Sequence, residues 1–335
     1  MELLRRLRID PYLLMLLATV GVAALLPVRG QGAVAFDYVV MAAIALLFFL
    51  YGAKLSPAAV GRGLLHWRLQ GTVVLITFGL FPLAGLGLAT LARGQLPADL
   101  LTGIVYLSLL PSTVQSSIAF TSIARGNVAA ALTSASISNL VGVALTPLLT
   151  ALVLGGAAGG MNAGSILDIA SQILLPFALG QLARPLIGDW LAGHKALTFA
   201  VDRGAILLVV YSAFSKGMVE GVWSRVSAHD LLWVFLLCGV LLGIIMGATA
   251  GLARALGFHR EDRIAILFCG SKKSLATGIP MAGILFAGQS MALIVLPLML
   301  FHQIQLFVCA ILAQRFAASA PANANPPSQT SSGKI

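Results

Sequence analysis

The composition of this 335-residue chain excludes an ordinary soluble protein. Apolar residues make up 59% of it and charged residues 10%, against roughly 45–50% and 25% in soluble domains. The formal net charge is +10. Because the basic residues lie between long apolar runs, orientation in a lipid bilayer explains this charge better than a nucleic-acid partner, which we exclude.

Ten apolar runs are long enough to cross a membrane, since a hydrocarbon core of about 30 Å requires roughly 20 apolar residues in a helix. In chain order they cover residues 12–27, 34–51, 69–92, 99–124, 127–154, 165–185, 198–215, 229–256, 264–287 and 289–314. Residues 317–335 are rich in Ala, Pro, Asn and Ser. They contain too few large apolar side chains to fold, and we expect a disordered cytoplasmic tail there.

The first run has a second interpretation. Three arginines precede it within the first eight residues, and small residues follow at 33–35, as in a secretory signal that is cleaved. Pro27 and Gly30 interrupt the stretch before such a cleavage site. This interruption favours a helix that is retained.

Lysine and arginine residues are distributed unevenly between the two sides of the membrane. An even number of spans puts both termini on one side. If that side is the inner one, the inner segments hold fifteen basic residues and the outer segments hold four: Arg29, Arg93, Lys216 and Arg225. The positive-inside rule therefore places both termini in the cytoplasm, and we expect a multi-pass protein of a bacterial-type inner (plasma) membrane.

The fourth and ninth runs contain polar clusters that predict broken helices. They read Leu110-Pro111-Ser112-Thr113-Val114-Gln115-Ser116-Ser117 and Cys269-Gly270-Ser271-Lys272-Lys273-Ser274. Pro111 removes a helical N–H and Gly270 weakens its helix, while the hydroxyl groups can satisfy the freed backbone groups.

Lys272 and its neighbour Lys273 are expected deep in the bilayer. Lys272 follows Ile264 by eight residues, which is roughly 12 Å at the helical rise. None of the eleven acidic residues falls near the membrane midplane, which argues against a proton relay or cation site built on a buried carboxylate. Alternatively, the lysines snorkel to the headgroups and the hydroxyls bond to their own helices. Adjacent helical residues point about 100° apart, which favours an interior role for the pair.

An internal duplication relates the two clusters. Pro111 and Gly270 are 270 − 111 = 159 residues apart, and Asn127 and Gln289, which follow the two broken runs, are 289 − 127 = 162 apart. A repeat of five spans must enter the membrane the second time with inverted topology, as in many secondary transporters. We therefore predict an all-α polytopic membrane protein of ten transmembrane helices in two inverted repeats, residues 1–160 and 161–316, followed by the tail 317–335.

At these residues the chain resembles the bile acid:sodium symporter family, solute carrier family 10, and within it the seventh-member-like and bacterial branch. The motifs that carry the resemblance are Leu110-Pro111-Ser112-Thr113, Ala124-Arg125-Gly126-Asn127, Thr146-Pro147 and Phe268-Cys269-Gly270-Ser271-Lys272-Lys273-Ser274. The resemblance implies a core domain of spans 3, 4, 5, 8, 9 and 10 and a panel domain of spans 1, 2, 6 and 7. Solute would bind between them, behind the crossing of the discontinuous spans 4 and 9.

The chain departs from the family where sodium-coupled members build their ion sites. Those members use a Ser-Asn pair in span 4, hydroxyls in span 5, a Glu and a Gln in span 9 and a Gln in span 3. Near the corresponding positions the chain has Ser116-Ser117 in span 4, Ala131 and Ala135 in span 5, and Thr77 in span 3. In span 9, Phe268 or Cys269 lies near the Glu position, and Lys272 or Lys273 lies near the Gln position.

An ammonium group at this place opposes sodium binding. Two cations 4 Å apart repel by about 4 kcal/mol at an effective dielectric constant of 20. We therefore expect the usual sodium sites to be absent. Our hypothesis is that a lysine ammonium occupies the cation's place, held by carbonyls at half-helix ends and by Ser116, Ser117 or Gln115. Proton coupling through Lys272 or Lys273 is the second hypothesis, so the coupling ion stays open between Na⁺ and H⁺.

The candidate solute- and ion-binding residues lie in spans 4, 5, 9 and 10. Further polar residues occupy equivalent places in spans 5 and 10: Asn139 in span 5, and His302, Gln303 and Gln305 in span 10. They can either line the crossing or form helix–helix hydrogen bonds. His302 has no further ligand at metal-binding spacing, and we expect no metal and no cofactor. The full candidate set is Ser112, Thr113, Gln115, Ser116, Ser117, Asn139, Ser271, Lys272, Lys273, Ser274, His302 and Gln303.

The predicted function is secondary active transport by alternating access. No dinucleotide-binding, Walker or zinc-protease motif is present, and we expect no enzyme and no catalytic residues. Two interior lysines without an interior carboxylate favour a small organic anion as the solute. The alternative is a non-transporting protein that regulates ion (calcium) homeostasis, which the resemblance to the seventh-member-like branch also allows.

Overall fold

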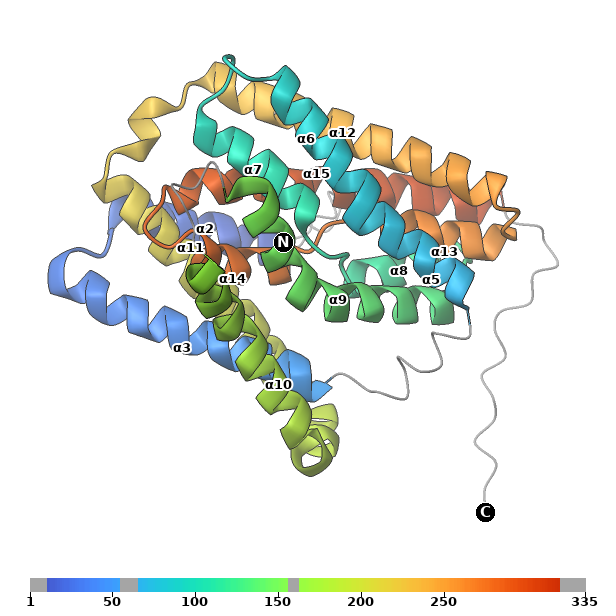
Figure 1. Cartoon of the computed structure of the whole chain (residues 1–335), viewed down its shortest axis with the longest axis horizontal. Helices are drawn as coiled ribbons and strands as arrows, with labels where there is room; N and C mark the ends of the chain where they lie inside the picture. Colours follow the sequence, from blue (N-terminus) through green and yellow to red (C-terminus); the bar gives the residue numbers. More distant parts are fainter. Residues whose placement is uncertain (1–10, 55–65, 156–162, 320–335) are drawn as a thin grey trace.

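The computed structural model describes residues 11–54, 66–155 and 163–319, and these residues are almost entirely helical (Figure 1). The first half contains α2 (Pro11–Leu25), α3 (Gly30–Lys54), α5 (Trp67–Leu75), a π-helical turn η1 (Ile76–Leu80), α6 (Phe81–Leu91), α7 (Ala98–Leu109), α8 (Gln115–Ile123) and α9 (Val128–Leu154). The second half contains α10 (Ala163–Gly193), α11 (Lys195–Val219), a short 3-10 helix η2 (Val222–Arg225), α12 (Ala228–Ala255), α13 (Arg260–Gly270), α14 (Leu275–Leu285) and α15 (Met291–Ala318).

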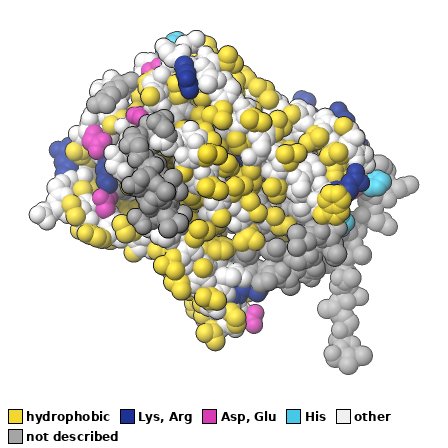
Figure 2. Space-filling model, in the orientation of Figure 1, with side chains coloured by type: hydrophobic (Ala, Val, Ile, Leu, Met, Phe, Trp, Pro, Cys, Tyr) yellow, Lys and Arg dark blue, Asp and Glu magenta, His cyan; other side chains and the backbone are white. Residues whose placement is uncertain are grey.

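Every apolar run expected from the sequence coincides with a helix or with consecutive helical pieces. Among the described residues, six helical segments are long and apolar enough to cross a membrane. Large apolar side chains such as Leu83, Leu152 and Leu186 are exposed on the outside of the bundle. Figure 2 shows apolar side chains over most of one face, with the charged ones near its edges. Such a surface is stable only against lipid, which identifies a multi-pass membrane protein.

The helices pack in two sets of neighbours. Helix α3 lies against α10 and α11, and α2 lies against α11. Helix α7 lies between α6 and α15, and α12 packs against α13 and α15. The two sets are connected by contacts of α11 with α14 and α15, and by contacts of α10 with α9.

Two glycines allow the backbones of α3 and α10 to approach closely. A methyl group placed on Gly52 would overlap the carbonyl oxygen of Phe177, and one on Gly180 would overlap that of Phe49. Close packing through small residues is a main source of helix association in lipid, where the hydrophobic effect does not drive helices together.

Both polar clusters interrupt their helices. Helix α7 ends at Leu109 and α8 begins at Gln115, while α13 ends at Gly270 and α14 begins at Leu275. The structure therefore contains the two breaks that the sequence predicted.

The short loop at residues 125–127 ties α9 to α13. Arg125 has a positive φ of 56°, and the Asn127 side chain caps α9 by accepting a hydrogen bond from the Ala130 amide at 2.9 Å. The same side chain donates to the Asp262 carboxylate at 2.8 Å. The long helix after the first break is thus anchored to the start of the helix that leads into the second.

Parts of the expected domain division lie outside the described residues. The boundary between residues 160 and 161 and all but the first three residues of the expected tail are among them. Helix α15 continues to Ala318, two residues into the segment that was expected to form the tail. The leader-like residues 1–10 also lie outside the described part.

The α3–α10 contact yields a prediction about stability. We expect Gly180→Val to lower the melting temperature of the purified protein by several degrees, because the added side chain must push α3 and α10 apart. The loss should be on the order of 1–3 kcal/mol, the usual range for overpacking. The matched control is Gly243→Val in α12, where a Cβ atom meets nothing within 4 Å. Equal melting temperatures for the two variants would contradict the proposed contact.

Candidate functional site at the two helix interruptions

The two breaks meet and are joined by hydrogen bonds between their backbones and hydroxyl groups. The Ser274 amide donates to the Pro111 carbonyl at 2.9 Å. The Ser112 hydroxyl donates to the Cys269 carbonyl at 2.5 Å, and that of Ser117 to the Phe268 carbonyl at 3.1 Å. Peptide groups that left their own helices are thereby satisfied without water, as the interior of a membrane protein requires.

Helix α9 satisfies further backbone groups of the first break. Thr146 donates its hydroxyl to the Leu109 carbonyl at 2.9 Å, and Ser138 accepts the Ser112 amide at 3.0 Å. Asn139 donates to the Ser112 carbonyl at 2.8 Å, and its side-chain oxygen accepts the Thr277 hydroxyl at 3.0 Å. For Asn139, the structure thus shows the helix–helix hydrogen bonds that were one of its two interpretations.

Lys273 satisfies three further backbone carbonyls at the centre of the crossing. Its Nζ atom donates to the carbonyl oxygens of Thr77, Ser108 and Leu110 at 2.8, 2.7 and 2.6 Å. An ammonium group has three N–H donors, so every donor has a carbonyl partner. The side chain is fully buried, and its nitrogen lies 4.1 Å from the centre of the Phe81 ring.

The three carbonyls are free because of local breaks in helical bonding. In the π turn the Phe81 amide bonds to Ile76, one residue further back than in an α-helix. The next residue, Pro82, has no N–H. Neither residue can therefore bond to the Thr77 carbonyl. The Ser108 carbonyl is free because its usual partner, the Ser112 amide, bonds to Ser138 instead.

Gln305 holds the backbone of residue 273 in place. Its side chain accepts the Lys273 amide at 2.8 Å and donates to the Lys273 carbonyl at 2.9 Å. His302 Nδ1 lies 2.8 Å from the amide nitrogen of Gln305. Helix α15 therefore positions the second break in the same way that α9 positions the first.

Lys272 has a different environment. It is also fully buried, but its ammonium makes one hydrogen bond among the described residues, to the Ser116 hydroxyl at 3.2 Å. The nitrogen lies 4.5 Å and 5.6 Å from the ring centres of Phe120 and Phe268. Neither lysine reaches the surface, so the snorkelling interpretation is wrong for both.

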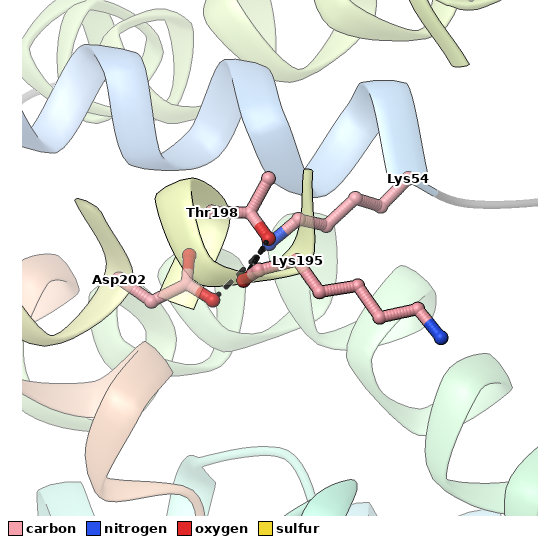
Figure 3. Close-up of polar contacts among 4 residues, drawn as sticks. All are labelled: Lys54, Lys195, Thr198 and Asp202. Atoms are coloured by element: carbon pink, nitrogen blue, oxygen red, sulfur yellow. Dashed lines mark hydrogen bonds and ion pairs between the residues drawn. The ribbon is translucent and has the colours of Figure 1, made fainter. Parts of the chain in front are cut away.

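A cavity of about 410 Å³ lies beside the crossing. One wall carries polar groups of the breaks and of α9, α14 and α15. The other wall is formed by α2, α3, α10 and α11. On this wall Lys54 of α3 forms an ion pair with Asp202 of α11 at 3.2 Å, and Lys195 points away from the pair (Figure 3). The polar and charged lining residues are Tyr12, Tyr51, Lys54, Thr113, Gln115, Ser116, Ser136, Asn139, Asp202, Arg203, Ser274, Thr277 and His302.

A second cavity of about 470 Å³ lies at the opposite ends of α3 and α11. Asp37 and Lys216 form an ion pair there at 2.8 Å. Helix α14 packs closely on α3 and α11 at this cavity: a Cβ atom on Gly283 would lie 3.3 Å from Ile44 and 3.4 Å from Val209, and all three residues line the second cavity. None of the described residues lines both cavities.

The candidate residues from the sequence fall into two groups. Six of them line the first cavity: Thr113, Gln115, Ser116, Asn139, Ser274 and His302. The other six do not line it: Ser112, Ser117, Ser271, Lys272, Lys273 and Gln303. Five of these are buried in the crossing or next to it, and Gln303 makes no hydrogen bond within the described part of the chain.

Sequence reasoning missed the wall opposite the breaks. The polar and charged residues on that wall are Tyr12, Tyr51, Lys54, Asp202 and Arg203. In the sequence they lie towards the ends of apolar runs, where charged and aromatic residues are common in any membrane protein. The only available signal was the pairing of basic and acidic residues near the ends of the second and seventh apolar runs.

Comparisons with known proteins find similarity over almost the whole chain. The model of the SBF-like CPA transporter family matches residues 10–318. "Uncharacterized protein PA2026" of Pseudomonas aeruginosa is 52% identical over 92% of this chain and 93% of its own. "Putative symporter YfeH" of Escherichia coli (strain K12) is 48% identical over 92% and 93%. "Sodium/bile acid cotransporter 7" of Mus musculus is 28% identical over 93% and 94%.

The contacts of Gln305 predict its effect on stability. Gln305→Leu removes the partners of the Lys273 amide and carbonyl, and each buried unsatisfied group costs on the order of 1–3 kcal/mol. We expect a clear drop in the melting temperature measured in detergent. Gln303→Leu, two residues away on the same helix, should change it little. A Gln305→Leu variant as stable as Gln303→Leu would show that these two hydrogen bonds do not hold the break.

Proposed function

The chain belongs to the SBF-like CPA transporter family, and from this membership we propose that it carries a small organic anion across the membrane by alternating access. The observation that carries the proposal is the cavity of about 410 Å³, which has the two helix breaks in its wall. Half-helix ends at a cavity are where secondary transporters bind solute and ions.

Two cavities at opposite ends of α3 and α11 support alternating access. Ile44, Val209 and Gly283 lie close together at the second cavity, and none of them is charged. A small sliding of α14 along α3 and α11 would shift this apolar packing and close one cavity as the other opens. With both termini in the cytoplasm, the cavity beside Lys54 opens inward.

Ten membrane crossings in two inverted repeats are the arrangement we propose for the helices. The broken pairs α7–α8 and α13–α14 count as one crossing each, and α5, η1 and α6 form another. Helices α2, α3, α10 and α11 would form the panel domain, since they pack on one another. The remaining helices, which surround the breaks, would form the core domain. The repeats would be residues 1–160 and 161–316.

We further propose that Lys273 takes the place of a bound cation. Three carbonyl oxygens from two different spans surround its ammonium, an arrangement that otherwise suits a hard metal cation. Ala131 and Ala135, both buried, supply no oxygen ligands from α9 side chains. The usual sodium sites would then be replaced by a cation that belongs to the chain. Ser116, one of the residues proposed to hold this lysine, contacts Lys272 instead.

Proton coupling has Lys272 as its better candidate. Its ammonium contacts the Ser116 hydroxyl, and Ser116 lines the cavity and lies 2.7 Å from the Thr113 hydroxyl. These hydroxyls connect the lysine to the cavity, whereas all three donors of Lys273 are occupied. Solute flux under imposed Na⁺ and pH gradients, measured for Lys272→Gln and Lys273→Gln, decides between the coupling ions.

Transport itself is tested in two steps. Thermal-shift screening of the purified protein against bile acids, small carboxylates, Na⁺ and Ca²⁺ identifies a ligand, because a ligand that binds only the folded state raises its melting temperature. Counterflow of the labelled hit in proteoliposomes then tests transport. We expect saturable counterflow of an organic anion. Stabilisation by Ca²⁺ alone, with no counterflow of any hit, would favour ion regulation instead.

Removing the Lys273 ammonium tests its role as a substitute cation. Lys273→Ala leaves three buried carbonyls without donors, at on the order of 1–3 kcal/mol each, and we expect a strongly lowered melting temperature. The space left among three oxygens suits Na⁺. Stability should therefore recover partly in NaCl but not in choline chloride of equal ionic strength. Lys272→Ala, which exposes no such cage, serves as the control. Recovery by both salts alike would count against the proposal.

A further inference from the structure

Arg203 is the one charged residue lining the cavity beside the crossing that has no oppositely charged partner among the described residues. The charged residues that line the cavity of about 410 Å³ are Lys54, Asp202 and Arg203. Lys54 and Asp202 pair at 3.2 Å. The lining therefore carries +2 − 1 = +1, and the excess charge belongs to Arg203. Lys272 and Lys273 do not line the cavity and cannot supply this charge at its surface.

Aromatic rings hold the Arg203 guanidinium in a fixed position. Its central carbon lies 4.0 Å from the centre of the Phe199 ring and 4.5 Å from that of Tyr12, and both rings line the same cavity. Stacking covers the flat faces of a guanidinium and leaves its edge, with five N–H donors, open to hydrogen bonding. The charge is thus oriented before any ligand arrives.

The described part of the chain offers the edge of this guanidinium no hydrogen-bond acceptor. Arg68 donates to the Leu256 carbonyl at 3.0 Å and Arg260 to the Phe316 carbonyl at 2.6 Å. Arg203, which is half-buried, has no such acceptor among the described residues. A half-buried cation with five free donors at a cavity surface calls for an anionic acceptor, and planar carboxylate or sulfonate groups match its geometry.

The rest of the cavity indicates what the anion is attached to. Apolar side chains, among them Val143, Phe177, Ile206 and Leu306, also line it. We propose that Arg203 receives the acidic group of a monoanionic organic solute whose apolar body lies along these side chains. The inference rests on the proposed function and assigns solute recognition to the wall opposite the breaks.

The experiment compares two probes that differ in charge but hardly in shape. Naphthalene-2-sulfonate and the neutral naphthalene-2-sulfonamide are titrated into protein in nanodiscs of the zwitterionic lipid phosphatidylcholine. We expect the wild type to bind the sulfonate at least about tenfold more tightly, a typical margin for a charge-assisted contact. Arg203→Gln should reduce this ratio to about one and leave sulfonamide affinity unchanged. Arg203→Lys should keep part of it, since it retains the charge but loses the planar fork.

The control removes a positive charge from the same helix. Lys195→Gln, at the start of α11, exposed and outside both cavities, should keep the wild-type ratio. Nanodiscs with added anionic phosphatidylglycerol distinguish the solute from a lipid headgroup: if Arg203 binds lipid instead, that lipid abolishes sulfonate binding, which would overturn the proposal.

Three further outcomes would also overturn the inference. If Arg203→Gln keeps the wild-type ratio, another group recognises the anion, and the proposed transport of an anion stands. If Arg203→Gln weakens both probes equally and lowers the melting temperature, Arg203 only fastens α2 to α11. If the wild type does not prefer the sulfonate, the inference fails together with the anionic character of the solute, while family membership and transport are unaffected.

Discussion

The central constraint on this structure is that peptide groups inside a lipid bilayer must find partners within the protein. Two helices break at the same depth, and their freed carbonyls would each be unstable alone. The Lys273 ammonium satisfies two of them, at the end of α7 and in the first break, together with a third carbonyl that the π turn η1 frees. Side chains of α9 and α15 satisfy the carbonyls of Leu109, Ser112 and Lys273. The crossing is therefore a bonded unit rather than a gap in the bundle.

The sequence allowed much of this architecture to be predicted, because its signals are local. The ten apolar runs correspond to helices, and both breaks occur where a proline or a glycine adjoins a series of hydroxyl residues. The division of roles between Lys272 and Lys273 could not be predicted. Residues outside a regular helix have no fixed angular relation, so adjacent lysines can point in different directions. Which of them meets carbonyls depends on a π turn almost 200 residues earlier in the chain.

Arg203 illustrates the limit of reasoning from sequence more sharply. In the sequence it was one of fifteen basic residues assigned to the inner side and nothing distinguished it. The role proposed for it depends on Tyr12 from another helix and on the absence of a hydrogen-bond acceptor among the described residues, and neither is visible before the chain is folded. Gln305, in contrast, was noticed as part of a polar group in the last span, although the candidate set retained His302 and Gln303. An amide that bonds to both backbone groups of one residue is recognisable only from coordinates.

The separation of the two cation roles has a consequence for coupling. In a site where a diffusible ion holds the breaks together, ion binding and solute binding are linked, because the solute cavity forms only when the ion is present. In the arrangement proposed for this chain, a covalently attached ammonium takes the place of that ion. The cavity wall is then preformed, and solute binding gains nothing from an ion at this position. If transport is driven by an ion gradient, the ion must act at a group whose bonding can change during the cycle. Lys272 satisfies that condition, because its one hydroxyl partner also lines the cavity, whereas Lys273 does not.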